Sequence, residues 1–221
     1  MNKTPLRFDL TVAFIGLALL LAWDASGLDL LCVRMVGDAS GFAWRDAWFT
    51  RGLFHEGGRM LAGAVIVLLL VNIWKPLLAG PTRRERIYAL AAAVFCMCLI
   101  PLFKRASHTS CPYNLAEFGG VATYVSHWSF GVLDGGPGHC FPSGHASAAF
   151  GFISLYFGLR SSRPALARGV LAAVLLLGAC YGWAQMARGA HYPSHTMWTA
   201  WICWVACAAG ASLPLRDGHL S

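Results

Sequence analysis

The chain has 221 residues, of which 57% are hydrophobic and only 12% are charged, and its mean hydropathy is +0.56. These values exclude an ordinary soluble domain and indicate a membrane protein. The formal net charge of +7 falls on one side of the predicted spans, so it reflects topology and requires no nucleic-acid partner.

Six apolar stretches are long enough, at about 20 residues each, to cross a bilayer. Backbone polar groups in lipid must be paired within their own segment, so we expect an all-α fold, a polytopic membrane helix bundle with six transmembrane helices. No linker or internal repeat separates the stretches, and residues 1–221 are predicted to form one domain. The six stretches are Phe8–Trp23, Met60–Leu78, Ile87–Phe103, Phe141–Leu159, Ala165–Met186 and Pro193–Leu213.

The first stretch also has features of a cleaved signal peptide, because Lys3 and Arg7 precede an apolar run of suitable length. Trp23-Asp24 makes a poor small-residue cleavage site, which favours a retained span. Both alternatives stay open, and the later spans face the same way in either case.

Lysine and arginine are distributed unevenly over the two sides of the predicted membrane. The N-terminus, the 75–86 loop, the 160–168 loop and the C-terminal tail carry ten of the 17 Lys and Arg residues and only three acids. On the opposite side, seven acids cancel the seven remaining basic residues. The positive-inside rule therefore predicts a multi-pass protein of a bacterial-type inner membrane, with a cytoplasmic N-terminus and a periplasmic outer loop region.

Residues 24–59 form the first outer segment, in which aromatic residues alternate with polar ones. This pattern predicts an amphipathic helix in the membrane interface, although an ordinary aromatic belt fits equally well. We expect His55 and Glu56 to be solvated. The aromatic residues are Trp44, Trp48, Phe49 and Phe54, and the polar ones are Arg45, Asp46, Arg51 and His55.

A short polar motif, Pro142-Ser143-Gly144-His145, stands at the start of the fourth stretch. Proline is tolerated in the first turn of a helix, so we expect a helix to begin at Pro142 or Ser143. The free N–H groups of a helix start, beside the Ser143 hydroxyl and Gly144, are predicted to bind an anion such as phosphate. His145 is then placed to protonate a bound group.

Three parts of the sequence are predicted to meet at the outer membrane surface. Lys104 ends the third span, residues 139–145 lead into the fourth, and residues 188–195 connect the fifth to the sixth. Arg188, His191 and His195 follow one another at spacings of three and four, which places them on one helical face. Cations, imidazoles and free N–H groups gathered at one point are what phosphoryl transfer through a histidine nucleophile requires.

These residues resemble the three motifs of the type 2 phosphatidic acid phosphatase family: Lys, six residues, Arg-Pro; Pro-Ser-Gly-His; and Ser-Arg, five residues, His, three residues, Asp. Residues 104–112 match the first motif with Cys111 in place of Arg, and residues 142–145 match the second completely. Residues 184–195 match the third with Ala184, Gln185 and His195 in place of Ser, Arg and Asp. Motif order and spacing agree over residues 87–210.

The resemblance implies a lipid-phosphate phosphatase of the membrane, a phosphoric ester or anhydride hydrolase that works through a phosphohistidine and without a cofactor or metal. It implies that His191 attacks phosphorus and that His145 protonates the leaving group. Lys104, Ser143 and Gly144 would hold the phosphate. The implied partners are the bilayer and a lipid substrate, for which undecaprenyl pyrophosphate, phosphatidate, phosphatidylglycerol phosphate and lipid A are candidates.

The departures from the family motifs affect the binding of phosphate and the support of His191. Two family arginines are missing, and we expect Arg188, one helical turn before His191, to replace one of them. A neutral His195 can accept a hydrogen bond from His191 and fix its tautomer, but it supplies no negative charge. We expect Asp134 or Glu117 of the outer loop to supply that charge.

Two alternatives to an active phosphatase follow from the histidines. One is a weakened or non-enzymatic family member that binds a lipid headgroup, and the other is a metal site made by His139, His145, His191 and His195. A phosphotransferase is also compatible with the motifs. Three further histidines, His108, His127 and His219, are expected to be hydrogen-bonded surface groups.

Eight cysteines divide between the spans and the outer side. Those inside spans are expected to pack as small apolar residues, whereas the outer ones lie in an oxidising compartment. Cys111 and Cys140 flank motifs that converge on one phosphate site, so we predict a disulfide between them, with Cys32 as an alternative partner. The cysteines inside spans are Cys96, Cys98, Cys180, Cys203 and Cys207.

Overall fold

The computed structural model describes residues 3–213, in which all regular structure is helical and no β-strand occurs. The all-α prediction is therefore confirmed. The long helices are α1 (Lys3–Ser26), α3 (Gly58–Trp74), α4 (Arg83–Ala106), α7 (Pro164–Ala187) and α8 (Pro193–Ser212). The short elements are α2 (Leu28–Arg34), the π-helix η1 (Trp48–Gly57), the 3-10 helices η2 (Pro112–Asn114) and η3 (Ala116–Phe118), α5 (Ser147–Phe150) and α6 (Ile153–Leu159).

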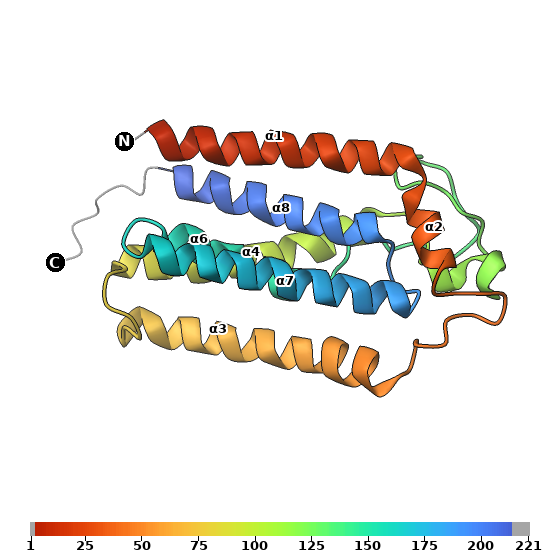
Figure 1. Cartoon of the computed structure of the whole chain (residues 1–221), viewed down its shortest axis with the longest axis horizontal. Helices are drawn as coiled ribbons and strands as arrows, with labels where there is room; N and C mark the ends of the chain where they lie inside the picture. The colour runs from red at the N-terminus through yellow and green to blue at the C-terminus, as the bar shows by residue number, and fades with distance from the viewer. Residues whose placement is uncertain (1–2, 214–221) are drawn as a thin grey trace.

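The long helices lie side by side in one bundle (Figure 1). α8 packs against α1, α4 and α6, and α4 also packs against α3. The connections from α3 to α4 and from α6 to α7 lie at one end of the bundle, where α1 begins. α2 and the connection from α4 to α5 lie at the other end, which we call the outer end.

Local sequence signals explain where the long helices begin. Thr82 and Glu85 form a capping box at the start of α4, in which each side chain accepts a hydrogen bond from the other residue's backbone N–H. Pro164 and Pro193 occupy the first positions of α7 and α8, where a missing N–H costs nothing. The helix starts at 83, 164 and 193 are therefore close to the predicted ones.

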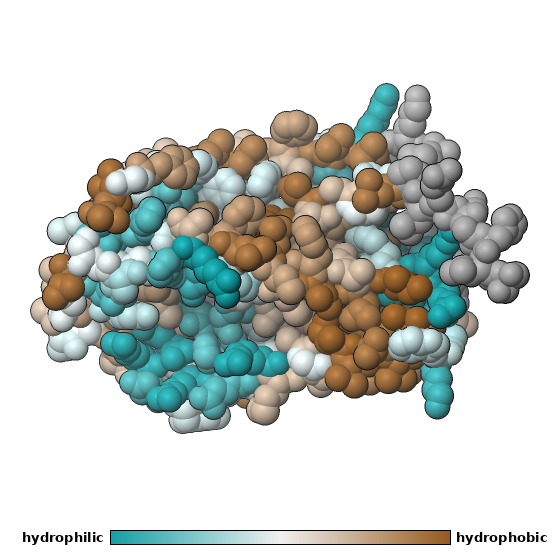
Figure 2. Space-filling view, turned by 180° about the vertical axis from the view of Figure 1, so that it is seen from behind, coloured by the Kyte–Doolittle hydropathy of each residue, from teal (hydrophilic) through white to brown (hydrophobic). Residues whose placement is uncertain are grey.

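Hydrophobic side chains fill the inside of the bundle and also cover much of its outside. Ile100, Phe150, Ile153 and Trp204 belong to the buried core that joins α4, α5, α6 and α8. On the outside, large apolar residues such as Phe14 are 70% exposed. Figure 2 shows that apolar residues cover the bundle away from the outer end and that polar residues gather near the outer end. An apolar outside of this kind is suited to lipid rather than water.

Four helices are long and apolar enough to cross a membrane: Leu6–Ser26, Trp48–Trp74, Arg83–Ala106 and Pro164–Ala187. They correspond to the first, second, third and fifth predicted spans. The sixth predicted span forms the helix α8, which lies outside this set of four and carries Ser194, His195, Thr196 and Thr199 in its first turns.

The prediction for residues 141–159 was wrong in its helix start and its continuity. The first helical residue is Ser147 rather than Pro142 or Ser143, and the helix is interrupted at Gly151 and Phe152 between α5 and α6. The Ser143 N–H donates to the carbonyl oxygen of His195, 3.1 Å away, so tertiary contact with α8 determines the backbone here. The interrupted helix Ser147–Leu159 is shorter than a full span.

The prediction for residues 24–59 was correct only in part. α1 continues to Ser26, α2 follows, and residues 35–47 are irregular. The π-helix η1 does not lie apart as a separate amphipathic helix, because it continues directly into α3 and gives one helical stretch from Trp48 to Trp74. The second span therefore begins twelve residues before the predicted start at Met60.

Candidate functional site

A cavity of about 550 Å³ opens near the outer end, and we call it the site cavity. It brings together residues that lie up to 146 positions apart, from residues 45–59, α4, the connection from α4 to α5, α5, α7 and the turn between α7 and α8. None of its lining residues is acidic. Its polar lining residues are Arg45, His55, Arg59, Lys104, Tyr113, His145, Gln185, Arg188 and His191.

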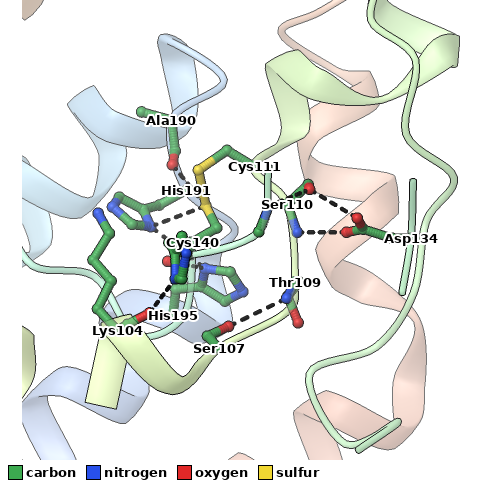
Figure 3. The surroundings of a disulfide bond; sticks show 12 residues. Lys104, Ser107, Thr109, Ser110, Cys111, Asp134, Cys140, Ala190, His191 and His195 are labelled. Atoms are coloured by element: carbon green, nitrogen blue, oxygen red, sulfur yellow. Dashed lines mark hydrogen bonds between the residues drawn. A yellow bond between two sulfur atoms is a disulfide. The ribbon is translucent and has the colours of Figure 1, made fainter. Parts of the chain in front are cut away.

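His191 lies in the turn between α7 and α8, and its side chain is buried against Cys140 and His195 (Figure 3). Its Nδ1 atom is 3.4 Å from His195 Nδ1 and 3.6 Å from the sulfur of Cys140. Burial, reinforced by the charge of Lys104, lowers the pKa of His191 well below its usual value. The ring is therefore neutral at pH 7, as a nucleophilic imidazole has to be.

His195 does not accept a hydrogen bond from His191 as predicted. Its Nδ1 atom lies 3.1 Å from the carbonyl oxygen of Cys140, which can only accept a hydrogen bond. That contact assigns the Nδ1 proton to His195, so the same nitrogen has no lone pair to accept from His191. The structure thus brings His191 and His195 together as predicted. The Nδ1–H group of His195, however, donates to the carbonyl oxygen of Cys140, so this nitrogen does not accept from His191.

His145 is held by η1, an element that the sequence did not connect with it. Its Nε2 atom donates to the carbonyl oxygen of Phe54 at 2.9 Å, and its ring stacks on His55 at 4.6 Å between centroids. The expectation that His55 is solvated was therefore wrong. Burial lowers the pKa of His145 to about 4. Since Nε2 carries the proton of the neutral ring, Nδ1 is the atom that can gain and release a second one.

Lys104 and Gly144 face each other across the site cavity wall. A methyl group placed on Gly144 would lie 3.9 Å from the Lys104 Nζ atom. Figure 3 shows the end of the Lys104 side chain beside the His191 ring. Among the described residues, no group accepts a hydrogen bond from the backbone N–H of Gly144, His145 or Ala146. These free donors beside a lysine are suited to an anion.

Ser143 is not part of the cavity lining. Its side chain is fully buried, and its hydroxyl has no hydrogen-bond partner in the described part of the chain. Its carbonyl oxygen accepts from Thr199 Oγ1 at 3.0 Å. The structure therefore places Ser143 behind the cavity wall, between the Gly144 turn and α8.

Arg188 and Gln185 come from the end of α7 and both line the site cavity. Arg188 Nε donates to the carbonyl oxygen of Arg45 at 2.8 Å, which leaves its terminal nitrogens available. Gln185 is 3% exposed, and its Nε2 atom has no partner among residues 3–213. A buried amide group without an acceptor is costly, and in a cavity wall the Gln185 amide is placed to donate to a bound group.

The turn that carries Arg188 and His191 depends on Gly189. Gly189 has φ +68°, a conformation that favours glycine, and a methyl group there would lie 2.3 Å from the Phe42 ring. Its carbonyl oxygen accepts from Tyr113 N–H, and the Gln185 carbonyl accepts from the N–H of Ala190. These contacts fix the His191 backbone beside the connection from α4 to α5.

The sulfur atoms of Cys111 and Cys140 are bonded, at 2.08 Å, and close a loop across 29 positions. The bond lies beside the His191 ring (Figure 3), and Cys32 is a free thiol. Cys111 and Cys140 both sit at less than one-tenth exposure. The disulfide therefore fixes residues 111 and 140 beside His191, the candidate nucleophile.

The prediction that Asp134 or Glu117 balances the charge of His191 was wrong. Asp134 accepts hydrogen bonds from the Ser110 N–H and hydroxyl, on the far side of the disulfide (Figure 3), and Glu117 pairs with Arg34. Neither contacts a histidine of the site cavity in the described structure. Both carboxylates instead stabilise the connection from α4 to α5.

The carboxylates nearest to α8 come from the end of α1 and from α2. Asp29 accepts from the Ser194 N–H and hydroxyl, and it fixes the start of α8. Asp24 lies 3.3 Å from His127, whose side chain is only 7% exposed and whose ring contacts the His195 ring. The expectation of a surface position for His127 was wrong, while His108 is exposed and His219 lies outside the described residues.

In the part of the chain that the structure describes, the donors that a metal site would require are not gathered in one place. Cys140, His191 and His195 have ligand atoms within 4.8 Å of one another, but the Cys140 sulfur is bonded to Cys111 and offers no thiolate. His139 is exposed, with Nδ1 3.3 Å from the Lys104 carbonyl oxygen, and it does not line the site cavity. Two imidazoles remain, fewer than the three or four protein ligands of a typical zinc site.

Two arginines and a tyrosine of the cavity wall were missed from the sequence. Arg45 and Arg59 belong to the outer segment before α4, and Tyr113 follows the first motif by one residue. The alternation of basic and aromatic residues in the segment was visible, but nothing in its spacing indicated contact with the motifs. Arg59 reaches the cavity because η1 continues directly into α3, whereas Arg45 is held there by its contacts with Arg188 and Tyr113.

A family model described as the PAP2 superfamily matches residues 85–217, more than half of the chain. No curated protein and no solved structure gives a significant match. The matched region contains α4 from residue 85 on, the turn at residues 144–146 and the turn between α7 and α8. These parts supply Lys104, His145 and His191 to the site cavity. The family match and the arrangement of these residues agree, and the chain belongs to the PAP2 superfamily.

Proposed function

We propose that the protein is a membrane lipid-phosphate phosphatase whose reaction takes place in the site cavity. The observation that carries this proposal is the charge of the cavity wall, where Lys104, Arg188 and two further arginines surround neutral His191 and His145 without any carboxylate. Such a wall favours a dianionic phosphate over any cationic or neutral ligand. Phosphatase chemistry is also the general activity of the superfamily.

In the proposed first step, the lone pair of the unprotonated ring nitrogen of His191 attacks phosphorus while the bond from phosphorus to the lipid oxygen breaks. His145 gives the proton of Nδ1 to that oxygen, and Lys104 and Arg188 hold the phosphate oxygens. In the second step, water attacks the phosphohistidine, passes a proton to His145 Nδ1, and the bond between nitrogen and phosphorus breaks. In both proposed steps, the three negatively charged phosphate oxygens lie beside the free N–H groups of residues 144–146.

The neutral state of His145 in the empty cavity is compatible with this role. An arriving phosphate dianion raises the pKa of a neighbouring imidazole, because it stabilises the protonated form. The Phe54 carbonyl oxygen, 2.9 Å from Nε2, supports the protonated ring as well. His145 is therefore proposed to load its proton together with the substrate.

We further propose six membrane crossings, with α8 and the interrupted α5–α6 segment added to the four apolar helices, and a periplasmic site in a bacterial-type inner membrane. The support is the basic charge of the connections at the end opposite the site cavity. Residues 75–86 and 160–168 carry Lys75, Arg83, Arg84, Arg86, Arg160, Arg163 and Arg168. The positive-inside rule places that end in the cytoplasm.

The test is release of inorganic phosphate by protein purified in detergent micelles, assayed against undecaprenyl pyrophosphate, phosphatidate, phosphatidylglycerol phosphate and lipid A. We expect turnover of at least one of the four that survives chelators and is inhibited by vanadate. His191→Ala is expected to abolish it without unfolding the protein, because loss of a nucleophile costs orders of magnitude in rate. Activity in His191→Ala, or activity lost with chelators, would contradict the proposal.

A matched pair of variants tests the role of Arg188. Arg188→Ala is expected to impair turnover strongly, and Arg188→Lys to restore it only partly, because a lysine cannot reproduce the planar guanidinium or its bond to the Arg45 carbonyl oxygen. Wild-type kinetics in Arg188→Ala would remove Arg188 from the phosphate site.

A further inference from the structure

The site cavity carries more positive charge than one phosphate group requires. A phosphate monoester brings a charge of about −1.5 to −2 at neutral pH. Lys104 and Arg188 match that charge on their own. Arg45 and Arg59 line the same cavity and add two permanent positive charges, with no acidic side chain in the wall to balance them.

Arg45 and Arg59 form no ion pair in the described structure, because the acidic residues between them pair with Arg51. Arg51 lies between them in the sequence and pairs with both Asp46, at 3.0 Å, and Glu56, at 3.7 Å. Within the described residues, no carboxylate forms an ion pair with Arg45 or Arg59. The two acids between Arg45 and Arg59 in the sequence are therefore occupied, and the two cavity arginines remain available for a ligand.

Arg45 is also oriented by its surroundings. Its guanidinium carbon lies 4.4 Å from the centroid of the Tyr113 ring, which is a cation–π distance. Its backbone carbonyl oxygen holds Arg188 Nε at 2.8 Å, so the segment and the end of α7 are fixed to each other. A charged group stacked in this way loses little freedom when it binds an anion.

Neither arginine belongs to the region that the family model matches, which begins at residue 85. The residues that carry the proposed chemistry lie inside that region, and Arg45 and Arg59 are contributed by the preceding outer segment. The site cavity therefore combines residues from inside and outside the matched region.

Building on the proposed function, we propose that Arg45 and Arg59 form a second anion-binding position in the site cavity. This position holds an anionic group of the substrate other than the phosphate that His191 attacks. The headgroups that fit are those with two neighbouring anionic groups, such as a diphosphate or a phosphate beside a second acidic group. Lys104, Arg188 and His145 hold the reacting phosphate, and the outer segment selects for the additional charge.

The experiment is isothermal titration of the detergent-solubilised protein with two probes. Orthovanadate occupies one phosphate position, and methylenediphosphonate presents two phosphorus groups that water cannot separate. For Arg45→Gln/Arg59→Gln we expect the dissociation constant of methylenediphosphonate to rise at least about tenfold per arginine, the loss typical of one charged hydrogen bond. The dissociation constant of orthovanadate should change less than about threefold.

Arg105→Gln is the matched control, because Arg105 is exposed at the outer end of α4 and lies outside the cavity lining. It should bind both probes like the wild type. Equal weakening of both probes in the double variant would place all cations at one phosphate position and overturn the proposal. It would also fall if the double variant matched the wild type, or if Arg105→Gln reproduced its loss.

Binding is measured without turnover, so the two proposals fail separately. If the wild type binds both probes but releases no phosphate from any lipid, the catalytic proposal fails and the second anion-binding position stands. If the wild type releases phosphate but the double variant keeps full affinity for methylenediphosphonate, only the second position fails.

Discussion

His191, in the wall of a cavity lined by no carboxylate, lies with its Nδ1 atom 3.4 Å from the Nδ1 atom of His195. His195 uses its Nδ1 proton for the carbonyl oxygen of Cys140, so it positions the backbone and packs against the nucleophile candidate. It is therefore proposed as a positioning residue that acts through Cys140 and His191.

A pair of variants at position 195 tests that role. His195→Ala removes the bond to the Cys140 carbonyl oxygen and leaves a void beside His191, so kcat should fall by about 100-fold, the cost of a misplaced reacting group. His195→Asn keeps an N–H donor and is expected to recover much of kcat with an unchanged KM. If His195→Asn were as slow as His195→Ala, the imidazole would have to take part in proton transfer with His191.

The low pKa of His145 gives a pH dependence of anion binding with a definite sign. The pKa is about 4 in the empty cavity and rises when a dianion binds, so binding takes up a proton between these two values. Affinity should consequently increase as the pH falls from 8 toward 5. Sulfate is a suitable probe, because its own charge does not change over that range.

The measurement is titration calorimetry with sulfate in two buffers of different ionisation enthalpy, which reports the protons taken up. His145→Asn is the control and should bind sulfate with no proton uptake from residue 145. Sulfate binding that is independent of pH in the wild type would exclude His145 from contact with the anion.

The unpaired Gln185 side chain predicts opposite effects on stability and on binding. Gln185→Leu removes a buried donor that has no partner, so the unfolding temperature in detergent should stay the same or rise. The same change removes a hydrogen bond to the phosphate, and the inhibition constant of vanadate should rise by roughly tenfold. Gln185→Glu adds a negative charge and should abolish inhibition. A destabilised Gln185→Leu with normal vanadate inhibition would make Gln185 a purely structural residue.

The disulfide should contribute to stability through the loop it closes. A bond across 29 positions lowers the entropy of the unfolded chain by an amount worth about 3–4 kcal/mol in the chain-entropy model. Cys111→Ser/Cys140→Ser is expected to unfold at lower denaturant concentration and to lose turnover, because residue 140 positions both His191 and His195. Mass spectrometry of alkylated, unreduced protein is the direct check, and iodoacetamide adducts on both cysteines in oxidised membranes would contradict the bond.

Much of the fold could be predicted because the signals are local. The apolar runs that became α4 and α7 have a capping box or an initial proline, and these features determine helix starts without reference to the rest of the chain. The break at Gly151 could not be predicted in this way. A methyl group there would lie 3.3 Å from the Ala93 carbonyl oxygen of α4, so tertiary packing sets this position.

The residues of the site can be divided in the same way, into those that local sequence patterns predict and those that depend on tertiary packing. Lys104, His145 and His191 follow motif spacing, Arg188 lies one helical turn before His191, and all four meet in the cavity. Asp134 was placed wrongly because an outer loop gives no information about which backbone donors it will find, and Ser110 provides them. Arg45 and Arg59 reach the cavity through tertiary contacts, of η1 with α7 and of the Arg45 carbonyl oxygen with Arg188, which appear only in the folded chain.

The most direct test of the central claim is to look for the covalent intermediate on His191. Protein mixed with a radiolabelled lipid phosphate that it turns over is quenched with alkali, which preserves phosphohistidine, and is then digested and analysed by mass spectrometry. The account predicts an acid-labile phosphoryl group on the peptide that contains His191, and its loss in His191→Ala. A phosphoryl group on His145 or another residue, or turnover with no trapped phosphoprotein at any quench time, would contradict the assignment of His191 as the nucleophile.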